Sequence, residues 1–237
     1  MPKQIQIKSV FDVAVSHGVK MLVYGRSGMG KTMLCATAPN PIIGSAESGL
    51  LSLSVANQKR VFGHVVDVPI VEINELSDLI QFYEWMEDPG CPYETVCLDS
   101  ITEIGEKVLA NALKQVSDPR QAYGELLEKM TNVLKMFRDL KGKHVVFVAK
   151  EMNNKDNATP LQIPAMPGSK VGPAMPYLMD EVFHLDVGTI TEGPQKGETY
   201  RYLQTQPDLQ FDAKDRSGAL DRIEEPNLTK VIEKIKS

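Results

Sequence analysis

The sequence predicts an α/β fold with a mostly parallel central sheet flanked by helices. Short apolar runs alternate with longer segments of helical periodicity, which is typical of strands joined by crossover helices. A glycine-rich segment stands where the first apolar run passes into the first helical pattern. The 237 residues, 42% of them hydrophobic, can fill one large core. We therefore expect one folding unit with short additions at its ends.

The apolar runs predict the strands of this sheet. They are expected at residues 19–24, 41–45, 65–72, 93–98, 144–149, 181–190 and 199–206. The segment TEGPQKGE joins the last two runs, and its glycines and proline predict an antiparallel hairpin near the C-terminus.

Helical periodicity predicts the crossover elements. Helices are expected at residues 31–38, 75–87, 101–115, 121–140 and 227–236. Asn227 precedes the last helix as a typical N-cap residue. The chain therefore divides into an N-terminal strand or linker segment (1–18), a core (19–222) and a C-terminal helix (223–237).

Residues 151–176 contain five prolines and show no clear period. A connection of this length without structure of its own is usually a functional loop, with disorder as the alternative. We expect a functional loop, because well-formed strands are predicted on both sides.

Composition excludes several classes of protein. The net charge of −5 gives no overall basic excess, so any contact with nucleic acid must be local. The apolar runs are shorter than a membrane span and the N-terminus lacks a secretory signal, which predicts a cytoplasmic protein without membrane contact. The three cysteines and four histidines lack metal-ligand spacing, so neither a disulfide framework nor a zinc site is expected.

The glycine-rich segment fits the P-loop pattern of a glycine, four residues, a second glycine, a lysine and a threonine. Its residues are Gly25, Arg26, Ser27, Gly28, Met29, Gly30, Lys31 and Thr32. Such a loop points successive N–H groups at phosphate oxygens. Lys31 is expected to reach the β- and γ-phosphates and the Thr32 hydroxyl to bind Mg²⁺. The motif therefore predicts ATP and Mg²⁺ as ligands, the alternative being a glycine-rich turn with an accidental lysine.

Two carboxylates are candidates for the rest of this site. The strand TVCLDS ends in Asp99 and Ser100, and we expect it to lie next to the P-loop strand. Asp99 would bind Mg²⁺ through coordinated waters, with Ser100 supporting the metal shell or the attacking water; a helix cap is the alternative. Glu47 follows the second strand, where ligands gather at the carboxyl edge of a sheet. We predict that Glu47 polarises the attacking water, the alternative being a solvated loop glutamate.

The P-loop, a glutamate after the second strand and an apolar strand ending in Asp-Ser together resemble the core of RecA-type recombinases. The resemblance implies a RecA-like P-loop NTPase core over roughly residues 19–222, in which the glutamate activates water. The strand HVVFVAKEM resembles the family's sensor strand, with Lys150 at the position that reads the γ-phosphate. The segment PAMPGSKVGPAMPYLMDEVFHLDV resembles the second DNA loop and its return through a short helix.

Two further segments resemble parts through which such recombinases assemble. AKDRSGALD carries Lys214 and Arg216, which resemble the basic pair that a neighbouring subunit inserts into the ATP site. A charged surface turn is the alternative. FDVA at residues 11–14 matches the short motif that links subunits in some recombinases, the alternative being that Phe11 packs under the sheet.

The chain also resembles phage-encoded P-loop ATPases that consist of a RecA core alone, some of which are single-strand-annealing proteins. This implies a DNA-dependent ATPase, in the host cytoplasm if phage-encoded, that binds single-stranded DNA and promotes recombination or annealing as a ring or filament of identical subunits. A single-stranded-DNA-binding protein is a further candidate partner. The candidate DNA contacts are Arg120, Tyr123, Lys155 and Lys170, although Tyr123 fits equally the first core residue of a helix. Two alternatives stay open: a small-molecule or nucleotide kinase, and a nucleotide-controlled phage adaptor without DNA activity.

Overall fold

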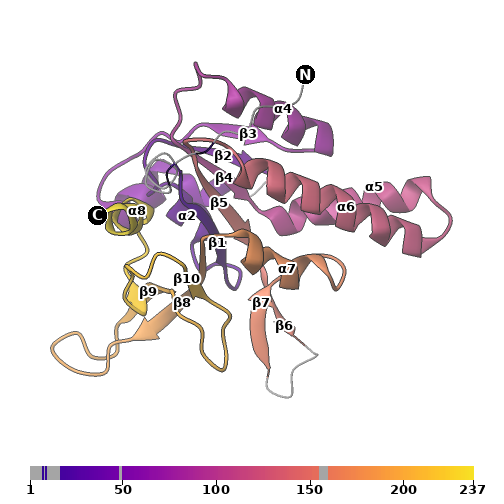
Figure 1. Ribbon diagram of the computed structural model, residues 1–237. Helices are drawn as coiled ribbons and strands as arrows, with labels where there is room; N and C mark the ends of the chain where they lie inside the picture. The colour runs from indigo at the N-terminus through magenta and orange to yellow at the C-terminus, as the bar shows by residue number, and fades with distance from the viewer. Residues whose placement is uncertain (1–6, 8, 10–16, 48–49, 155–159) are drawn as a thin grey trace.

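The computed structural model describes residues 7, 9, 17–47, 50–154 and 160–237. The FDVA motif at 11–14 and Lys155 lie outside the described residues. A mixed sheet forms the centre of the described part, with strand order β11-β9-β8-β1-β5-β4-β2-β3 and β10 beside β8 (Figure 1). The strands of the parallel part are β1 (Lys20–Tyr24), β2 (Pro41–Ser45), β3 (Ile70–Glu72), β4 (Thr95–Asp99), β5 (His144–Ala149) and β8 (Glu181–Thr189).

Antiparallel strands extend the sheet beyond β8. They are β9 (Thr199–Gln204), β10 (Lys214–Asp215) and β11 (Ile223–Glu224). The predicted hairpin is confirmed, because β8 and β9 pair antiparallel from His184 opposite Gln204 to Thr189 opposite Thr199.

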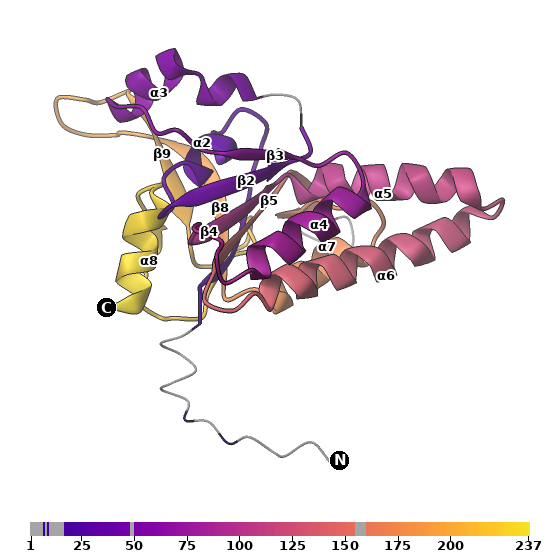
Figure 2. The ribbon, with the colours of Figure 1, turned by 90° about the horizontal axis from the view of Figure 1, so that it is seen from above.

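Helices cover both faces of the sheet and give three layers (Figure 2). One face carries α4 (Leu76–Glu87), α5 (Ile101–Gln115), α6 (Pro119–Arg138) and α7 (Val171–Leu178), and the other carries α2 (Lys31–Cys35) and α8 (Leu228–Lys236). Residues alternate between the two cores along each strand: Val145 and Phe147 of β5 face the first layer, and Val146 and Val148 face the second. The sheet is therefore buried on both faces, as the apolar runs predict.

Several expectations on secondary structure are corrected. Only Ile70–Glu72 of the predicted strand 65–72 forms a strand, and Pro69 before it has no N–H to donate to a ladder. The 3₁₀ turn η1 (Leu50–Leu53) and the helix α3 (Val55–Phe62) are additional elements. The helix predicted at 31–38 ends at Cys35, whereas the helix predicted at 121–140 begins at Pro119 and ends at Arg138.

The segment 151–176 has structure of its own, contrary to the expected unstructured connection. It forms an antiparallel hairpin of β6 (Glu151–Asn154) and β7 (Leu161–Pro164), and then enters α7. Its strands are only four residues long, and α7 contains Pro176, so neither element produces a readable period.

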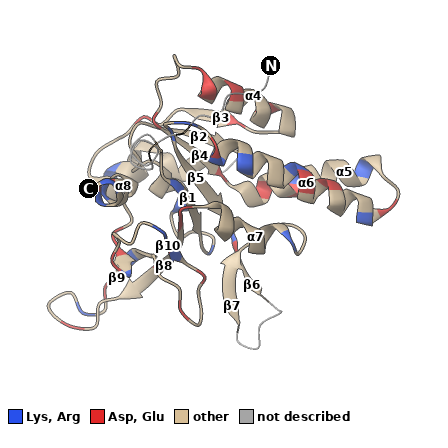
Figure 3. Cartoon of the chain, viewed as in Figure 1, with Lys and Arg blue, Asp and Glu red and all other residues tan. Residues whose placement is uncertain are grey.

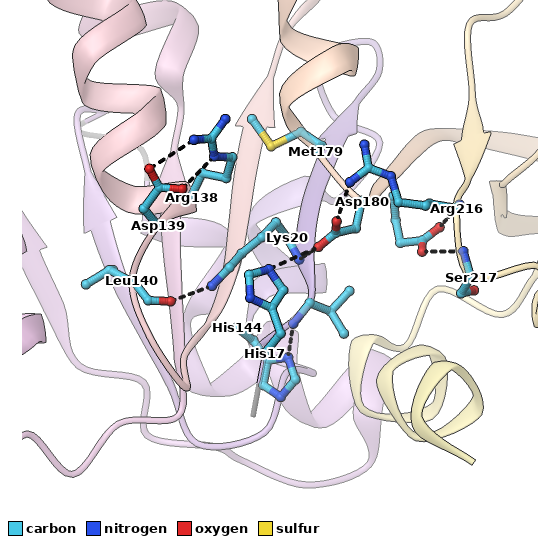
Figure 4. A network of polar contacts seen from close by, with 12 residues as sticks. His17, Lys20, Arg138, Asp139, Leu140, His144, Met179, Asp180, Arg216 and Ser217 are labelled. Atoms are coloured by element: carbon cyan, nitrogen blue, oxygen red, sulfur yellow. Dashed lines mark hydrogen bonds and ion pairs between the residues drawn. The ribbon is translucent and has the colours of Figure 1, made fainter. Parts of the chain in front are cut away.

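Buried polar groups bond one another at the amino edge of the parallel strands (Figure 4). The Lys20 ammonium donates to the carbonyls of Leu140 at 2.7 Å and Lys143 at 2.6 Å, and the Val19 N–H donates to His144 Nδ1 at 3.0 Å. Burial lowers the pKa of Lys20 to about 8 and the pKa of His144 to about 4. At neutral pH Lys20 is therefore still mostly a cation, whereas His144 is neutral.

Glu181 begins β8 at the same edge and is 1% exposed. Its carboxylate oxygens accept the N–H groups of Arg216 and Ser217, each at 3.2 Å. Burial, with the charge of Asp215 next in size, raises the pKa of Glu181 to about 8. Glu181 is therefore largely protonated in the native protein at neutral pH.

We expect Glu181 to make the protein less stable as the pH rises. Between its unfolded pKa of 4.5 and its native pKa of about 8, the native state binds the extra proton, so the free energy of unfolding falls with increasing pH. Glu181→Gln should remove this decline, which is on the order of 3 kcal/mol between pH 5 and 8. Urea denaturation of both proteins across this range measures it. Equal slopes would show that Glu181 is ionised in the native state.

Candidate functional site

The P-loop runs from the end of β1 into α2 and depends on glycine at both ends. A Cβ at Gly25 would lie 2.5 Å from the carbonyl oxygen of Leu185, a distance that no side chain tolerates. Gly30 is the N-cap of α2 with φ of 99°, in the left-handed region that favours glycine. The P-loop glycines thus allow a turn that an ordinary residue would disrupt.

Lys31 lies within the curve of this loop. Its ammonium donates to the carbonyl oxygens of Gly25 at 2.7 Å and Arg26 at 2.8 Å. Burial lowers its pKa, while the carboxylates of Asp99 and Glu47 act in the opposite direction. The predicted phosphate-binding cation is therefore positioned beside both predicted carboxylates.

Thr32 and Asp99 meet directly. The Thr32 hydroxyl donates to Asp99 Oδ2 at 2.5 Å, and Asp99 is 5% exposed. Burial raises the pKa of Asp99, and the hydrogen bond from Thr32 opposes that rise. A hydroxyl and a carboxylate are oxygen donors of the kind that Mg²⁺ prefers, so these residues fit the expected metal.

The strand that carries Asp99 does not lie next to the P-loop strand, contrary to the expectation. β5 lies between β4 and β1 and pairs in parallel with both. Thr32 still reaches Asp99, because the P-loop projects over the carboxyl ends of the strands. Strand order is a long-range property, and the order of apolar runs along the chain does not specify it.

Glu47 and Ser100 form a second pair at the same edge. The Ser100 hydroxyl donates to Glu47 Oε1 at 2.8 Å. Ser100 also caps α5 by accepting the N–H of Glu103 at 3.3 Å, so the capping alternative applies to Ser100 rather than to Asp99. Glu47 lines the same cavity as Lys31, Thr32 and Asp99.

Lys150 follows β5 and also lines this cavity, about half exposed. Its ammonium pairs with Glu103 at 2.8 Å and Glu106 at 3.6 Å, both on α5. Its main-chain N–H donates to the Thr102 hydroxyl at 3.0 Å. The side chain is thus held toward α5, and its role as a γ-phosphate sensor stays a prediction.

The cavity over the P-loop has a volume of about 520 Å³, which suits a nucleotide. Of the predicted nucleotide-binding residues, it is lined by Ser27, Gly28, Gly30, Lys31, Thr32, Asp99 and Lys150. Arg26 instead pairs with Asp186 at 3.0 Å, and Met29 packs against the core on the α2 side. Two lining arginines were not predicted: Arg60 comes from the unexpected helix α3, and Arg201 comes from β9. No sequence motif predicts these two arginines, because only the tertiary structure brings them to the cavity.

Lys214 and Arg216 lie at the opposite edge of the sheet. β10 pairs antiparallel with the first residues of β8, Lys214 opposite Val182. The Lys214 ammonium donates to the carbonyls of Pro176 at 3.0 Å and Met179 at 2.6 Å. The Arg216 guanidinium pairs with Asp180 at 2.9 Å and is 55% exposed (Figure 4). Neither residue reaches the P-loop of its own chain, and action in trans stays a prediction.

Three of the predicted DNA contacts line one groove of about 460 Å³ between α6 and the segment before α7. They are Arg120, Tyr123 and Lys170. Tyr123 is 47% exposed, while Ala122 and Leu126 form the buried face of α6, so Tyr123 is not a core residue. Acidic and basic residues are interspersed along α5 and α6, and the basic groups of this groove are therefore local (Figure 3).

A parallel sheet covered on both faces, a P-loop after its first strand and a Thr32–Asp99 pair at the same edge define an AAA-type P-loop ATPase domain. Residues 17–217 match the family described as an AAA domain, and the chain belongs to that family. No curated protein matches the sequence significantly. No helix in the described part of the chain is long and apolar enough to cross a membrane.

Proposed function

We propose that this protein hydrolyses ATP while bound to single-stranded DNA, and that it promotes recombination or annealing as a ring or filament of identical subunits. The groove lined by Arg120, Tyr123 and Lys170 carries the proposal. It offers an exposed aromatic ring and two cations in one groove, the combination that binds single strands by stacking and phosphate contact.

Each of the residues around the P-loop has a separate role in the proposed hydrolysis of ATP. Lys31 would hold the β- and γ-phosphates, and Glu47 would accept the proton of the water that attacks the γ-phosphorus, with ADP leaving. Ser100 orients Glu47 through its hydrogen bond. Thr32 and Asp99 would hold Mg²⁺, which when bound neutralises phosphate charge.

The groove and the ATP cavity share a hydrogen-bonded connection. The Ala165 N–H donates to the Lys150 carbonyl at 2.7 Å, and the Thr102 hydroxyl donates to the Ala165 carbonyl at 2.8 Å. Lys150 lines the cavity, and Gly168, soon after Ala165, lines the groove together with Tyr123. A change at the phosphates therefore has a short covalent and hydrogen-bonded route to the groove, which supports coupling of turnover to DNA.

ATP turnover with and without a long single-stranded DNA, at several salt concentrations, tests the proposal. We expect DNA to stimulate turnover and salt to weaken the stimulation, because phosphate contacts release counterions. Turnover indifferent to DNA, with no DNA binding at low salt, would contradict it. Phosphoryl transfer to a small acceptor would indicate a kinase, and nucleotide binding without turnover would indicate an adaptor.

Tyr123→Ala should weaken single-stranded DNA binding about 10-fold, because one stacked base contributes roughly 1–3 kcal/mol. Its turnover without DNA should match the wild type. Tyr200→Ala is the matched control, since Tyr200 is 46% exposed and lies on β9, outside the groove. Fluorescence anisotropy of a labelled oligonucleotide measures the change. Equal affinities for the wild type and both variants would remove Tyr123 from the DNA site.

A further inference from the structure

The β8–β9 hairpin brings an arginine to the P-loop from outside the motif. Arg201 of β9 pairs with Val187 of β8. Two residues further along β9, Leu203 is buried in the core beneath α2 and α8, so Arg201 points toward the same side of the sheet. This is the side on which the P-loop enters α2.

The Arg201 side chain lies against Gly30. Its Nε, Cδ and Cζ atoms are 3.5, 3.7 and 3.9 Å from the position that a Cβ on Gly30 would occupy. Arg201 also lines the cavity with Lys31 and Thr32. The guanidinium is therefore within reach of a ligand that the P-loop holds.

Among the described residues, the Arg201 side chain has no hydrogen-bond or ion-pair partner, although the side chains of other cations around the loop have theirs. Arg26 pairs with Asp186, Lys150 pairs with Glu103, and Arg60 donates to Asn57 at 2.5 Å. An arginine held beside an anion site with its donors unused is suited to bidentate binding of phosphate oxygens.

We propose that Arg201 binds the α- and β-phosphates of the nucleotide held in its own subunit. The P-loop backbone around Gly30 cradles these two phosphates, which places them beside the guanidinium. The β8–β9 hairpin then acts as a second wall of the nucleotide site. This inference rests on nucleotide binding at the P-loop and does not depend on DNA.

Equilibrium binding of ADP, a non-hydrolysable ATP analogue and adenosine to the full chain, without DNA, tests this assignment. Arg201→Ala should weaken ADP and the ATP analogue about 10- to 100-fold, the range for a lost charge-assisted contact. Its adenosine affinity should equal that of the wild type. Arg201→Lys should recover part of the loss, because an ammonium supplies the charge without the planar fork.

Arg222→Ala is the matched control, because Arg222 is exposed and its ion pair with Asp208 lies outside the cavity. Its affinities should match those of the wild type. Unchanged ADP affinity in Arg201→Ala, or an equal loss for adenosine, would overturn the phosphate assignment. A wild-type chain that binds ADP but not DNA would contradict the proposed DNA function and leave this inference intact.

Discussion

Lys31→Ala is expected to lower ATP turnover by about 100-fold or more, through loss of electrostatic stabilisation at the transferred phosphate. The Lys31 ammonium already lies against the Gly25 and Arg26 carbonyls inside the loop. Lys150, the other lysine that lines the cavity, is held by glutamates of α5 and cannot replace it without breaking those pairs. Phosphate release from ATP measures the effect.

Lys141→Ala is the control for this change, because Lys141 is exposed in the turn before β5 and lies outside the cavity. Thermal unfolding should give similar midpoints for both variants and the wild type. Wild-type turnover in Lys31→Ala would show that the P-loop is not the site of hydrolysis.

Glu47→Gln is expected to keep ATP binding and to slow hydrolysis by roughly 100- to 10,000-fold, the usual contribution of a general base. The amide keeps the size of the carboxylate, and its oxygen can still accept the hydrogen bond that Ser100 donates to Glu47. It cannot take a proton from water. Single-turnover hydrolysis and nucleotide binding, measured together, separate the two effects.

Glu84→Gln is the matched control, because Glu84 is exposed on α4 and remote from the cavity lining. Loss of ATP binding in Glu47→Gln would indicate a structural role for this carboxylate. Normal hydrolysis would place the water-orienting group elsewhere.

Patterns that are local in sequence predicted much of the molecule. The P-loop, the strands β1, β2 and β5 and the helices α4 and α5 follow from runs of neighbouring residues, so their positions can be read directly. The shared location of Glu47 and Asp99 was also predictable, because residues that end parallel strands meet at one edge of the sheet, while their roles stay predictions.

The features that could not be predicted from the sequence depend on contacts between residues far apart in the chain. The residues HVVFVA do not indicate that β5 lies between β1 and β4. In the same way, the residues TYRYLQ do not indicate that the Arg201 side chain lies against Gly30. The groove arises in the same way, because α6 and the residues before α7 lie far apart in sequence. Short elements such as α3 were not predicted, because one or two helical turns contain too few apolar repeats to reveal a periodicity.

The ATP cavity and the pair Lys214 and Arg216 lie at opposite edges of one sheet. In a ring or filament, a subunit that offers this pair to a neighbour's nucleotide stacks on that neighbour head to tail, because two different edges then meet at every contact. Such a stack has polarity, with a nucleotide exposed at one end and an unused basic pair at the other, unless it closes into a ring. A subunit carrying Arg216→Glu would then add at only one of these ends and would stop growth there.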